Sequence, residues 1–408
     1  MSAATTTVEE ELPPTRGTPG RNDWAGEIVV TALAFLAALV FGAVLIAISD
    51  APTRKSFGYF FQHPTDTLSS AWSAIAAGYS ALFRGAVLNT NSLYSNGGVP
   101  IFGPISDTLV NAAPLILGGL AVTVAFRAGM FNIGVQGQLI MGAICAGYVG
   151  FAVSLPPGLH LLVALVAGIV GGAVWGGLVG FLKAKTGAHE VITTIMLNYI
   201  AVALLSYLLG VQGFQKKGST QAISGTVHGT ARFPHLFDDL HSGIIAALLA
   251  AALCWWLLSR STLGFTLRAV GANAFAARTA GMKIERSYFT VMLISGALAG
   301  LVGCSQILGT RDALTQDVDS GFGFDAITVA LLGRGTPVGT VLAGLLFGAF
   351  RAGGIVMASD TTTPSDVVSV MEPVMVLFIA APALIRGLFR LRASSVGGIG
   401  QLAKGWNG

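Results

Sequence analysis

Long apolar runs separated by short polar stretches dominate this sequence. About 20 apolar residues in a row cross a bilayer as a helix, and a window of that length predicts ten spans. They lie at 28–48, 107–126, 131–153, 159–182, 191–210, 242–259, 288–308, 322–333, 338–357 and 367–386. The eighth run is too short to cross alone, so we expect a half-helix or re-entrant segment buried in protein. The pattern predicts an all-α, polytopic membrane helical bundle of about ten transmembrane segments.

Two apolar regions are interrupted by glycine and polar residues rather than by a polar loop. One covers 126–138, and the other covers 321–337 around the short eighth run. Transporters often build their pathway from broken helices at corresponding places in two inverted halves. Runs two to five and seven to ten would be those halves here. Run seven comes five runs after run two, and because successive spans alternate in direction, this odd separation makes the two halves cross the membrane in opposite directions. The candidate pathway residues in these regions are Phe126, Asn132, Gln136, Gln138 and Asp325.

Polar and aromatic residues inside the apolar runs have two interpretations each. Arg351 and Glu372 either serve function or pair with each other, because an unpaired charge in lipid is costly. Asn198 is better explained by a hydrogen bond between helices. Four aromatic rings flank the polar positions and could stack on a planar ligand, although packing and lipid contact are the more common roles of such rings. These rings belong to Phe126, Phe131, Phe322 and Phe324.

Glycine recurs every four residues along the fourth apolar run. Small residues at this spacing let helix backbones approach closely. Pairs of glycines with the same spacing occur in the seventh and ninth runs. Since the chain has 54 glycines, a single pair carries little weight, but four in register predict a tight packing seam. The residues of this seam are Gly168, Gly172, Gly176 and Gly180.

Composition excludes the main soluble classes of protein. Hydrophobic residues make up 53% of the 408 residues and charged residues only 10%, whereas a soluble domain carries about 25% charged residues. The formal net charge is +4 without a dense basic run, which excludes a nucleic-acid partner. The three cysteines lie in separate apolar runs, and the three histidines between 211 and 241 lack the spacing of a zinc motif. We therefore expect no metal site.

Lysine and arginine positions predict the orientation of the chain. With the N-terminus inside, inside basic residues outnumber outside ones by roughly two to one, which places both termini in the cytoplasm. Residues 1–27 would be a disordered acidic cytoplasmic tail, 28–390 the transmembrane domain and 391–408 a cytoplasmic C-terminal tail. The outside segment 49–106 includes an amphipathic stretch, 71–87, which we expect along the membrane surface.

The inside loop 260–287 has basic ends and a middle of small apolar residues. A free loop would be more polar, so we expect an Ala-rich helix over 269–282, ended by Gly281, that docks into a groove on a partner. A plain amphipathic surface helix is the alternative. The chain contains no Gly-x-x-x-x-Gly-Lys-Ser/Thr motif. Any ATPase that drives transport must therefore be another polypeptide, and we expect this chain to catalyse no covalent chemistry.

Several segments resemble one family of membrane proteins. Phe275-Ala276-Ala277-x-x-x-Gly281 is similar to the Glu-Ala-Ala-x-x-x-Gly coupling loop of ABC importer permeases, with Phe275 in place of the glutamate. Residues 267–281 resemble the permeases for branched-chain amino acids, ribose and nucleosides. The segments that resemble the nucleoside branch in particular are 125–138, 189–200 and 323–333. The similarity covers most of the chain and leaves out the acidic tail.

This resemblance implies a permease subunit of a bacterial ABC importer in the cytoplasmic membrane. Its partners would be a second, homologous permease, an ATPase subunit that holds ATP and Mg²⁺, a substrate-binding lipoprotein outside and the membrane lipid. The chain itself would bind no cofactor. The residues implied in coupling to the ATPase are Gly271, Phe275, Ala276, Ala277 and Gly281.

The resemblance also implies a nucleoside as the cargo. One alternative keeps the class and changes the cargo to ribose or another simple sugar. A second alternative is a stand-alone secondary transporter, which the short supply of acidic residues inside the apolar runs argues against.

Overall fold

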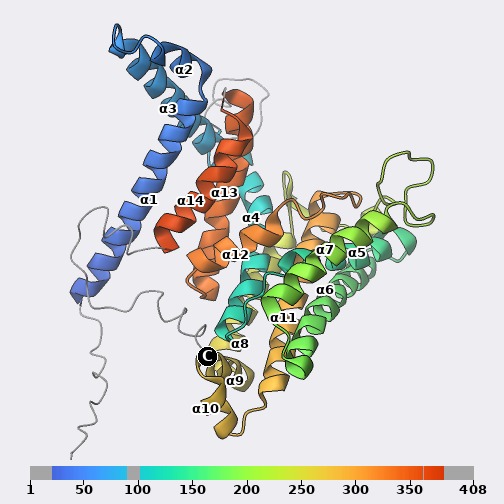
Figure 1. Ribbon diagram of the computed structural model, residues 1–408. Coiled ribbons are helices and arrows are strands. Elements are labelled where there is room, and N and C mark those ends of the chain that lie inside the picture. The colour runs from blue at the N-terminus through green and yellow to red at the C-terminus, as the bar shows by residue number, and fades with distance from the viewer. Residues whose placement is uncertain (1–20, 90–101, 362, 381–408) are drawn as a thin grey trace, which may run out of the picture.

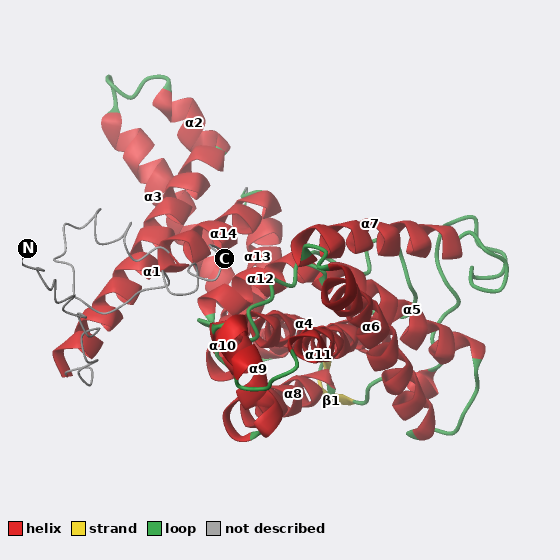
Figure 2. Cartoon of the chain, turned by 60° about the horizontal axis from the view of Figure 1, so that its bottom comes forward, coloured by secondary structure: helices red, strands yellow, loops and turns green. Residues whose placement is uncertain are grey.

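The computed structural model describes residues 21–89, 102–361 and 363–380, which form a bundle of helices (Figure 1, Figure 2). Within these ranges the strands are β1 (His235–Phe237) and β2 (Leu240–His241), which pair antiparallel, and a single 3₁₀ turn, η2, covers Gly229–Ala231. The all-α prediction is confirmed. Residues 21–27, expected as part of the N-terminal tail, instead begin the helix α1 (Arg21–Ser49). The remaining predicted tails, 1–20 and 391–408, lie outside the described residues.

Eight helices among the described residues are long and apolar enough to cross a membrane. They correspond to predicted runs one to seven and nine. The helices of runs eight and ten, α12 (Phe322–Leu332) and α14 (Ser365–Ala380), have 11 and 16 residues. The polytopic bundle is confirmed, but the count of ten crossings is not: α12 has only 11 residues, fewer than a bilayer core requires, and α14 is described only as far as Ala380. The eight are α1, α4 (Gly103–Arg127), α5 (Val135–Ala152), α6 (Leu159–Thr186), α7 (Glu190–Leu208), α8 (Gly243–Arg260), α11 (Ile284–Ser305) with its π-helical end η3 (Gln306–Thr310), and α13 (Pro337–Asp360).

Two further helices, α2 (Ala51–Phe57) and α3 (Pro64–Ala86), follow α1. The prediction that 71–87 lies along a membrane surface is wrong, because α3 packs beside α1 and α13 (Figure 1). The hydroxyl of Tyr79 donates a hydrogen bond to a backbone oxygen of α1. A Cβ atom built at Gly85 would lie 3.0 Å from a backbone carbon of α13. Protein, rather than a membrane surface, therefore covers this face of the amphipathic helix.

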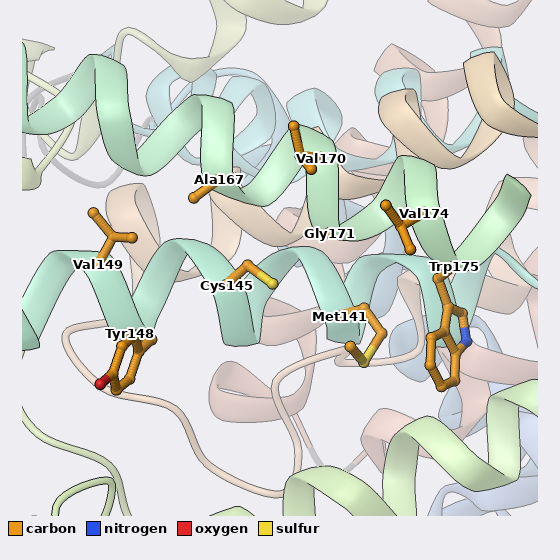
Figure 3. A pocket seen from close by; sticks show the side chains of 9 residues that line it. All are labelled: Met141, Cys145, Tyr148, Val149, Ala167, Val170, Gly171, Val174 and Trp175. Atoms are coloured by element: carbon orange, nitrogen blue, oxygen red, sulfur yellow. The ribbon is translucent and has the colours of Figure 1, made fainter.

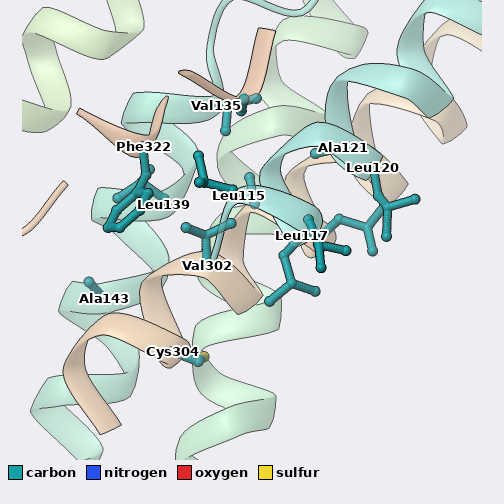
Figure 4. Close-up of a cluster of buried hydrophobic side chains, with 14 of the residues drawn as sticks. Leu115, Leu117, Leu120, Ala121, Val135, Leu139, Ala143, Val302, Cys304 and Phe322 are labelled. Atoms are coloured by element: carbon teal, nitrogen blue, oxygen red, sulfur yellow. The ribbon is translucent and has the colours of Figure 1, made fainter. Parts of the chain in front are cut away.

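The core lies where α4, α5, α11 and α12 meet (Figure 4). Its side chains include Leu115 and Leu117 from α4, Val135 from α5, Val302 from α11 and Phe322 from α12, each less than 5% exposed. Lipid tails are as apolar as these side chains, so close packing rather than exclusion of water holds such helices together.

Helices α6 and α11 pack along the glycine face of α6. A Cβ atom at Gly172 would lie 2.6 Å from the Cα of Gly300, and one at Gly176 would lie 2.9 Å from the Cα of Gly296. The glycine pair of α13 packs in the same way on α4, because a Cβ atom at Gly344 would lie 2.5 Å from a side-chain carbon of α4. Each predicted half thus packs one long helix against the other half: α6 on α11, and α13 on α4.

Both predicted interruptions are breaks between helices. After α4 the chain turns at Gly129, whose φ is +72°, and α5 starts only at Val135. Val135 in α5 and Ala326 in α12 both lie beside Gly118, with carbon atoms 3.7 and 2.8 Å from a Cβ atom built there. Since Gly118 lies well inside α4, α5 and α12 begin within the bundle. The structure therefore has the broken helices that the sequence predicts.

Candidate functional site

The first break is held by a buried hydrogen-bond network around Asn132. Its Nδ2 donates to Oε1 of Gln138 at 3.0 Å and to Oγ of Ser295 at 2.7 Å, and Ser295 in turn donates to the backbone oxygen of Ala121. Asn132 and Gln138 are both at most 1% exposed. These two predicted pathway residues therefore fix the break to α4, α5 and α11 and present little surface to a passing solute.

Asn198 of α7 fixes the same break from a third side. Its Oδ1 accepts a hydrogen bond from the backbone N–H of Gly137 at 2.8 Å, and its Nδ2 donates to the backbone oxygen of Ile133 at 3.0 Å. This is the hydrogen bond between elements that the sequence favoured for Asn198. Satisfying backbone groups at a break is necessary inside a membrane, where water is absent.

The starts of α5 and α12 touch each other. The Nε2 of Gln136, in the first turn of α5, donates to Oδ2 of Asp319 at 2.9 Å. Asp319 lies in the non-helical segment before α12. A Cβ atom at Gly323 would lie only 2.5 Å from the Cβ of Gln136, so glycine is needed where the two helices meet. The two breaks thus form one junction inside the bundle.

Arg351 of α13 completes this junction. Its Nη2 donates to Oδ2 of Asp325 at 2.9 Å and to the backbone oxygen of Ser320 at 2.6 Å, and its guanidinium carbon lies 4.1 Å from the centre of the Phe322 ring. Among the described residues Arg351 forms its ion pair with Asp325, whereas the predicted pairing with Glu372 stays a prediction. The side chain of Glu372 lies outside the described residues.

We call this set the polar junction: Gln136, Asp319, Ser320, Asp325 and Arg351. All five are half-buried. Charged side chains in membrane-spanning helices face a bundle interior or a water-filled space, because lipid is too costly an environment. Two aspartates, an arginine and an amide therefore form a polar cluster at the meeting point of two broken helices.

The four aromatic residues beside the breaks differ in exposure. Phe322 is 4% exposed beneath Arg351, whereas Phe324, two residues further on, is 52% exposed. Phe126 and Phe131 are half-buried and contact each other in a tilted arrangement, with ring centres 4.8 Å apart and an interplanar angle of 34°. Of the four rings, that of Phe324 has the most surface open to a ligand.

The loop that follows α8 lies at the lower end of the bundle in Figure 1 and holds two helices. The prediction of one helix over 269–282 is wrong: α9 (Thr262–Ala272) ends at Asn273, whose Oδ1 then accepts a hydrogen bond from the backbone N–H of Ala276 and caps α10 (Ala274–Thr279). Gly281 does follow the helical segment, with a φ of +82° that favours glycine.

The motif residues of α10 lie on both its exposed and its buried side. Phe275 is 80% exposed and Ala276 is also exposed, whereas Ala277 is 4% exposed and packs with Val270 of α9 and Ile284 of α11. An exposed phenylalanine on a short helix anchored by buried alanine and valine forms an apolar knob at the end of the bundle.

Gly271 links this segment to the first break. A Cβ atom built on Gly271 would lie 2.5 Å from the backbone oxygen of Arg127 and 2.7 Å from the backbone nitrogen of Gly129. The Nε of Arg127 donates to the backbone oxygen of Gly335, in the turn between α12 and α13, at 2.6 Å. Gly271 of α9 therefore lies against the start of the first break, and Arg127 in turn bonds the turn between α12 and α13.

A separate apolar groove of about 550 Å³ lies between α5 and α6 (Figure 3). Met141, Cys145 and Tyr148 line it from α5, and Val174 and Trp175 from α6. Its lining offers few polar atoms to a sugar or a base. Among the described residues no group of three His, Cys, Asp or Glu could hold a metal ion.

Sequence reasoning missed Asp319, Ser320 and Ser295 as members of these networks. Residues 311–321 form a largely polar stretch between the seventh and eighth apolar runs. The available signal was the position of this loop directly before a helix too short to cross, since such a segment must enter the bundle to reach the start of the helix.

Comparisons with known proteins agree with this architecture. A family model described as "Branched-chain amino acid transport system / permease component" matches residues 105–380. Over 324 residues the chain is 42% identical to the guanosine ABC transporter permease protein of Bacillus subtilis, which covers 77% of this chain and 88% of that protein. It is 34% identical over 386 residues to the glucose ABC transporter permease protein of Haloferax volcanii (91% of each chain).

A third relative is the nucleoside ABC transporter permease protein of Lactococcus lactis subsp. cremoris. It is 33% identical over 364 residues, which are 86% of this chain and 91% of that protein. No solved structure is significantly similar to this chain.

Proposed function

The chain belongs to the branched-chain amino acid transport system permease family, and from this premise we propose that it forms the membrane pathway for nucleosides in an ABC importer. The observation that supports this most is the polar junction, where two broken helices begin inside the bundle. Transporters place their substrate sites at such breaks. Of the three relatives described above, two are named for guanosine or nucleoside transport, including the one with the highest identity.

Energy would come from a separate ATPase subunit that holds ATP and Mg²⁺, since this chain lacks a phosphate-binding loop. The exposed ring of Phe275 and the adjacent Ala276 would insert into a groove on that subunit, with Ala277 anchoring α10 from behind. A helix in a groove transmits force in both directions. We accordingly place α9, α10 and both termini on the cytoplasmic side.

Closure of the ATPase would move α9 and, through the contact of Gly271 with Gly129, the first break. The hydrogen bond between Arg127 and Gly335 would carry the same movement to the turn after α12. Both helices of the polar junction would then shift together. The access of this junction would change from one side of the membrane to the other, as alternating access requires.

A second permease and an external substrate-binding lipoprotein would complete the importer. The binding protein would supply much of the selectivity, so the pathway itself needs only a modest affinity. This chain would bind no cofactor and catalyse no covalent step.

Glucose is the second candidate cargo, because the glucose permease of Haloferax volcanii is 34% identical over 91% of this chain. A sugar and a nucleoside share hydroxyl groups, and the half-buried carboxylates of the polar junction could accept hydrogen bonds from either. Only the nucleoside has a planar base.

The test of cargo uses the whole importer in proteoliposomes, with ATP inside and the binding lipoprotein outside. Uptake of labelled guanosine, uridine and glucose is measured with ATP and with a non-hydrolysable analogue. We expect ATP-dependent uptake of at least one nucleoside. Uptake of glucose with no uptake of either nucleoside would overturn the nucleoside assignment in favour of a sugar permease.

A further inference from the structure

We propose that residues 311–318, which we call the outer gate, close the pathway above the polar junction, and that residues 224–232 of the loop between α7 and α8, the strap, hold this gate shut. The inference rests on the proposed function and specifies which element closes the pathway on the side from which the cargo arrives. Alternating access requires such a closure on each side of the site.

The outer gate lies between one end of the bundle and the polar junction. Nε2 of His241, directly before α8, lies 3.4 Å from Oγ1 of Thr310, the last residue of η3. Since α9 follows the other end of α8, Thr310 lies at the end of the bundle opposite α9, which we place outside. From there the chain runs through the gate to Asp319 of the polar junction and to α12, which begins inside the bundle. The gate therefore occupies depth between the outer end and the junction.

The inner side of the gate is apolar. Leu314 and Val318 are completely buried, and Ala313 is 9% exposed. A Cβ atom built on Gly147 of α5 would lie 2.9 Å from a side-chain carbon of Leu314, so the gate packs closely against α5. Apolar constrictions close membrane pathways because water leaves them. Close packing of this kind also leaves no room for a solute as large as a nucleoside.

The strap is bonded to the gate along its length. The backbone N–H of Ser224 donates to the backbone oxygen of Leu314 at 3.1 Å, and the N–H of Leu314 donates to Oγ of Ser224 at 2.8 Å. The N–H of Val227 donates to the backbone oxygen of Asp312 at 2.8 Å. An ion pair of 2.8 Å between Arg232 and Asp312 follows. Because these contacts run antiparallel over several residues, the strap fixes the gate as a unit.

The strap is itself fixed to the helices on its other side. The backbone N–H of His228 donates to the backbone oxygen of Gly150, in α5, at 2.9 Å. Oγ1 of Thr230 lies 2.8 Å from Nδ1 of His160, in α6, within hydrogen-bond distance. The strap therefore ties the gate, which belongs to the second predicted half, to helices of the first half. Movement of one half against the other must break one of these two sets of bonds.

The gate is bounded by irregular backbone at both ends. It follows the π-helical turn η3, and such turns occur frequently at functional sites. It ends before Ser320 and Gly321, whose φ values are +46° and +79°. A non-glycine residue in this left-handed region stores strain, which is typical of switch regions. Between these ends Arg311 donates to Oγ1 of Thr315 at 3.1 Å and to Oγ of Ser320 at 2.8 Å, so the gate is held together as one compact unit.

The test measures access to the polar junction from outside. Gln136→Cys places a thiol at the junction of the complete importer, in right-side-out membrane vesicles without ATP. A charged methanethiosulfonate reagent that does not cross membranes is added outside, and the rate of modification is measured. The protein without this substitution gives the background of the three native cysteines. All further variants carry Gln136→Cys, so its own effect cancels in the ratio of their rates.

We expect slow modification of the Gln136→Cys protein and a rise of at least about fivefold when Ser224→Ala is added. The alanine leaves the buried N–H of Leu314 without its acceptor when the gate is closed, whereas water satisfies this N–H when the gate is open. Fivefold corresponds to about 1 kcal/mol, the lower limit of the cost of such an unpaired group. The matched control is Ser219→Ala, the same change in the same loop, because Oγ of Ser219 bonds only to Gln221. It should leave the rate unchanged.

A second variant keeps the test decisive if Ser224→Ala fails to assemble, which size exclusion shows. Asp312→Asn weakens the ion pair with Arg232, and the side chain of Asp312 is 63% exposed, so folding does not depend on it. Since an exposed ion pair contributes little, we expect a rise of only about twofold.

Three results would overturn the outer gate. One is modification of the Gln136→Cys protein as fast as that of Lys217→Cys, which places a thiol on the exposed part of the same loop. Another is an unchanged rate in both Ser224→Ala and Asp312→Asn. The third is an equal rise in inverted vesicles, which would show general loosening of the bundle. The labelling needs no cargo, so a wild-type importer that moves no nucleoside overturns the proposed function separately.

Discussion

Replacement of Gly271 by alanine tests how α9 is linked to the membrane pathway. The added Cβ atom would lie 2.5 Å from the backbone oxygen of Arg127, 2.7 Å from the carbonyl carbon of Ala128 and 2.7 Å from the nitrogen of Gly129. Carbon atoms in contact prefer about 3.5–4.0 Å, so α9 and the first break must separate by about 1 Å. All three neighbours are backbone atoms that cannot rotate away.

Overpacking of this kind costs about 1–3 kcal/mol. If that energy is lost from the coupling between α9 and the break, coupling falls by about 5–150-fold. ATP hydrolysis and guanosine uptake are measured on the same proteoliposomes, and their ratio is the readout. We expect Gly271→Ala to retain ATP hydrolysis and to lower uptake per ATP at least fivefold. The control is Ala272→Val, which adds more volume at the neighbouring exposed position.

The reasoning is refuted if Gly271→Ala transports as many nucleosides per ATP as the wild-type protein. A loss of ATP hydrolysis together with uptake would also contradict it, because the contact would then serve docking of the ATPase rather than transmission. Size exclusion of the assembled complex separates either result from a failure to fold.

Three further predictions concern the bundle itself. Gly172→Leu should lower the melting temperature of the importer, because the α6–α11 contact has no room for a side chain and overpacking costs about 1–3 kcal/mol. Thermal unfolding measures this, with Val174→Leu, on the exposed side of α6, as the control that should keep the melting temperature. Arg351→Gln should abolish uptake and destabilise the protein, because it leaves the charge of Asp325 uncompensated. The double variant Arg351→Gln with Asp325→Asn should regain stability, since no uncompensated charge remains. If the melting-temperature changes of the two single variants simply add in the double variant, the ion pair is contradicted. Burial lowers the pKa of His241 from 6.5 to about 4, so the folded state holds it neutral and stability should fall as pH drops from 6.5 towards 4. Profiles of stability against pH for the wild type and His241→Gln should differ in slope over that window and run parallel above it, offset by the hydrogen bond that His241 accepts from Gly243.

The sequence predicts the fold where a local pattern has a single physical solution. A run of 20 apolar residues must be a buried or membrane helix, and the glycines of α6 must face another backbone. That face meets Gly296 and Gly300, the pair of equal spacing in α11. Interruptions by glycine without a polar loop likewise predicted that helices break inside the bundle.

The errors arise where tertiary packing decides. An amphipathic stretch such as 71–87 suits a membrane surface and a helix bundle equally, and only the available face of α13 determines the outcome. The Ala-rich segment after α8 divides at Asn273 because its side chain caps a new helix, a choice that helix propensity does not reveal.

The site was predicted only in part for the same reason. Gln136 and Asp325 belong to the polar junction, but their partners Asp319 and Arg351 are 183 and 26 residues away. Hydropathy identifies a charged residue in an apolar run but not which distant residue lies beside it, so the pairing of Arg351 with Asp325 was not predicted.

The central claim is that this chain is a pathway driven by another subunit. The measurement that tests it most directly is mild-detergent purification of the tagged chain from its native membrane, with mass spectrometry of the co-purifying proteins and reconstitution of both the complex and the chain alone. We predict recovery of an ATPase with phosphate-binding loops, a second permease and a lipoprotein, and guanosine uptake only by the complex with ATP. A chain that purifies alone and accumulates guanosine from an ion gradient without an ATPase would contradict the account.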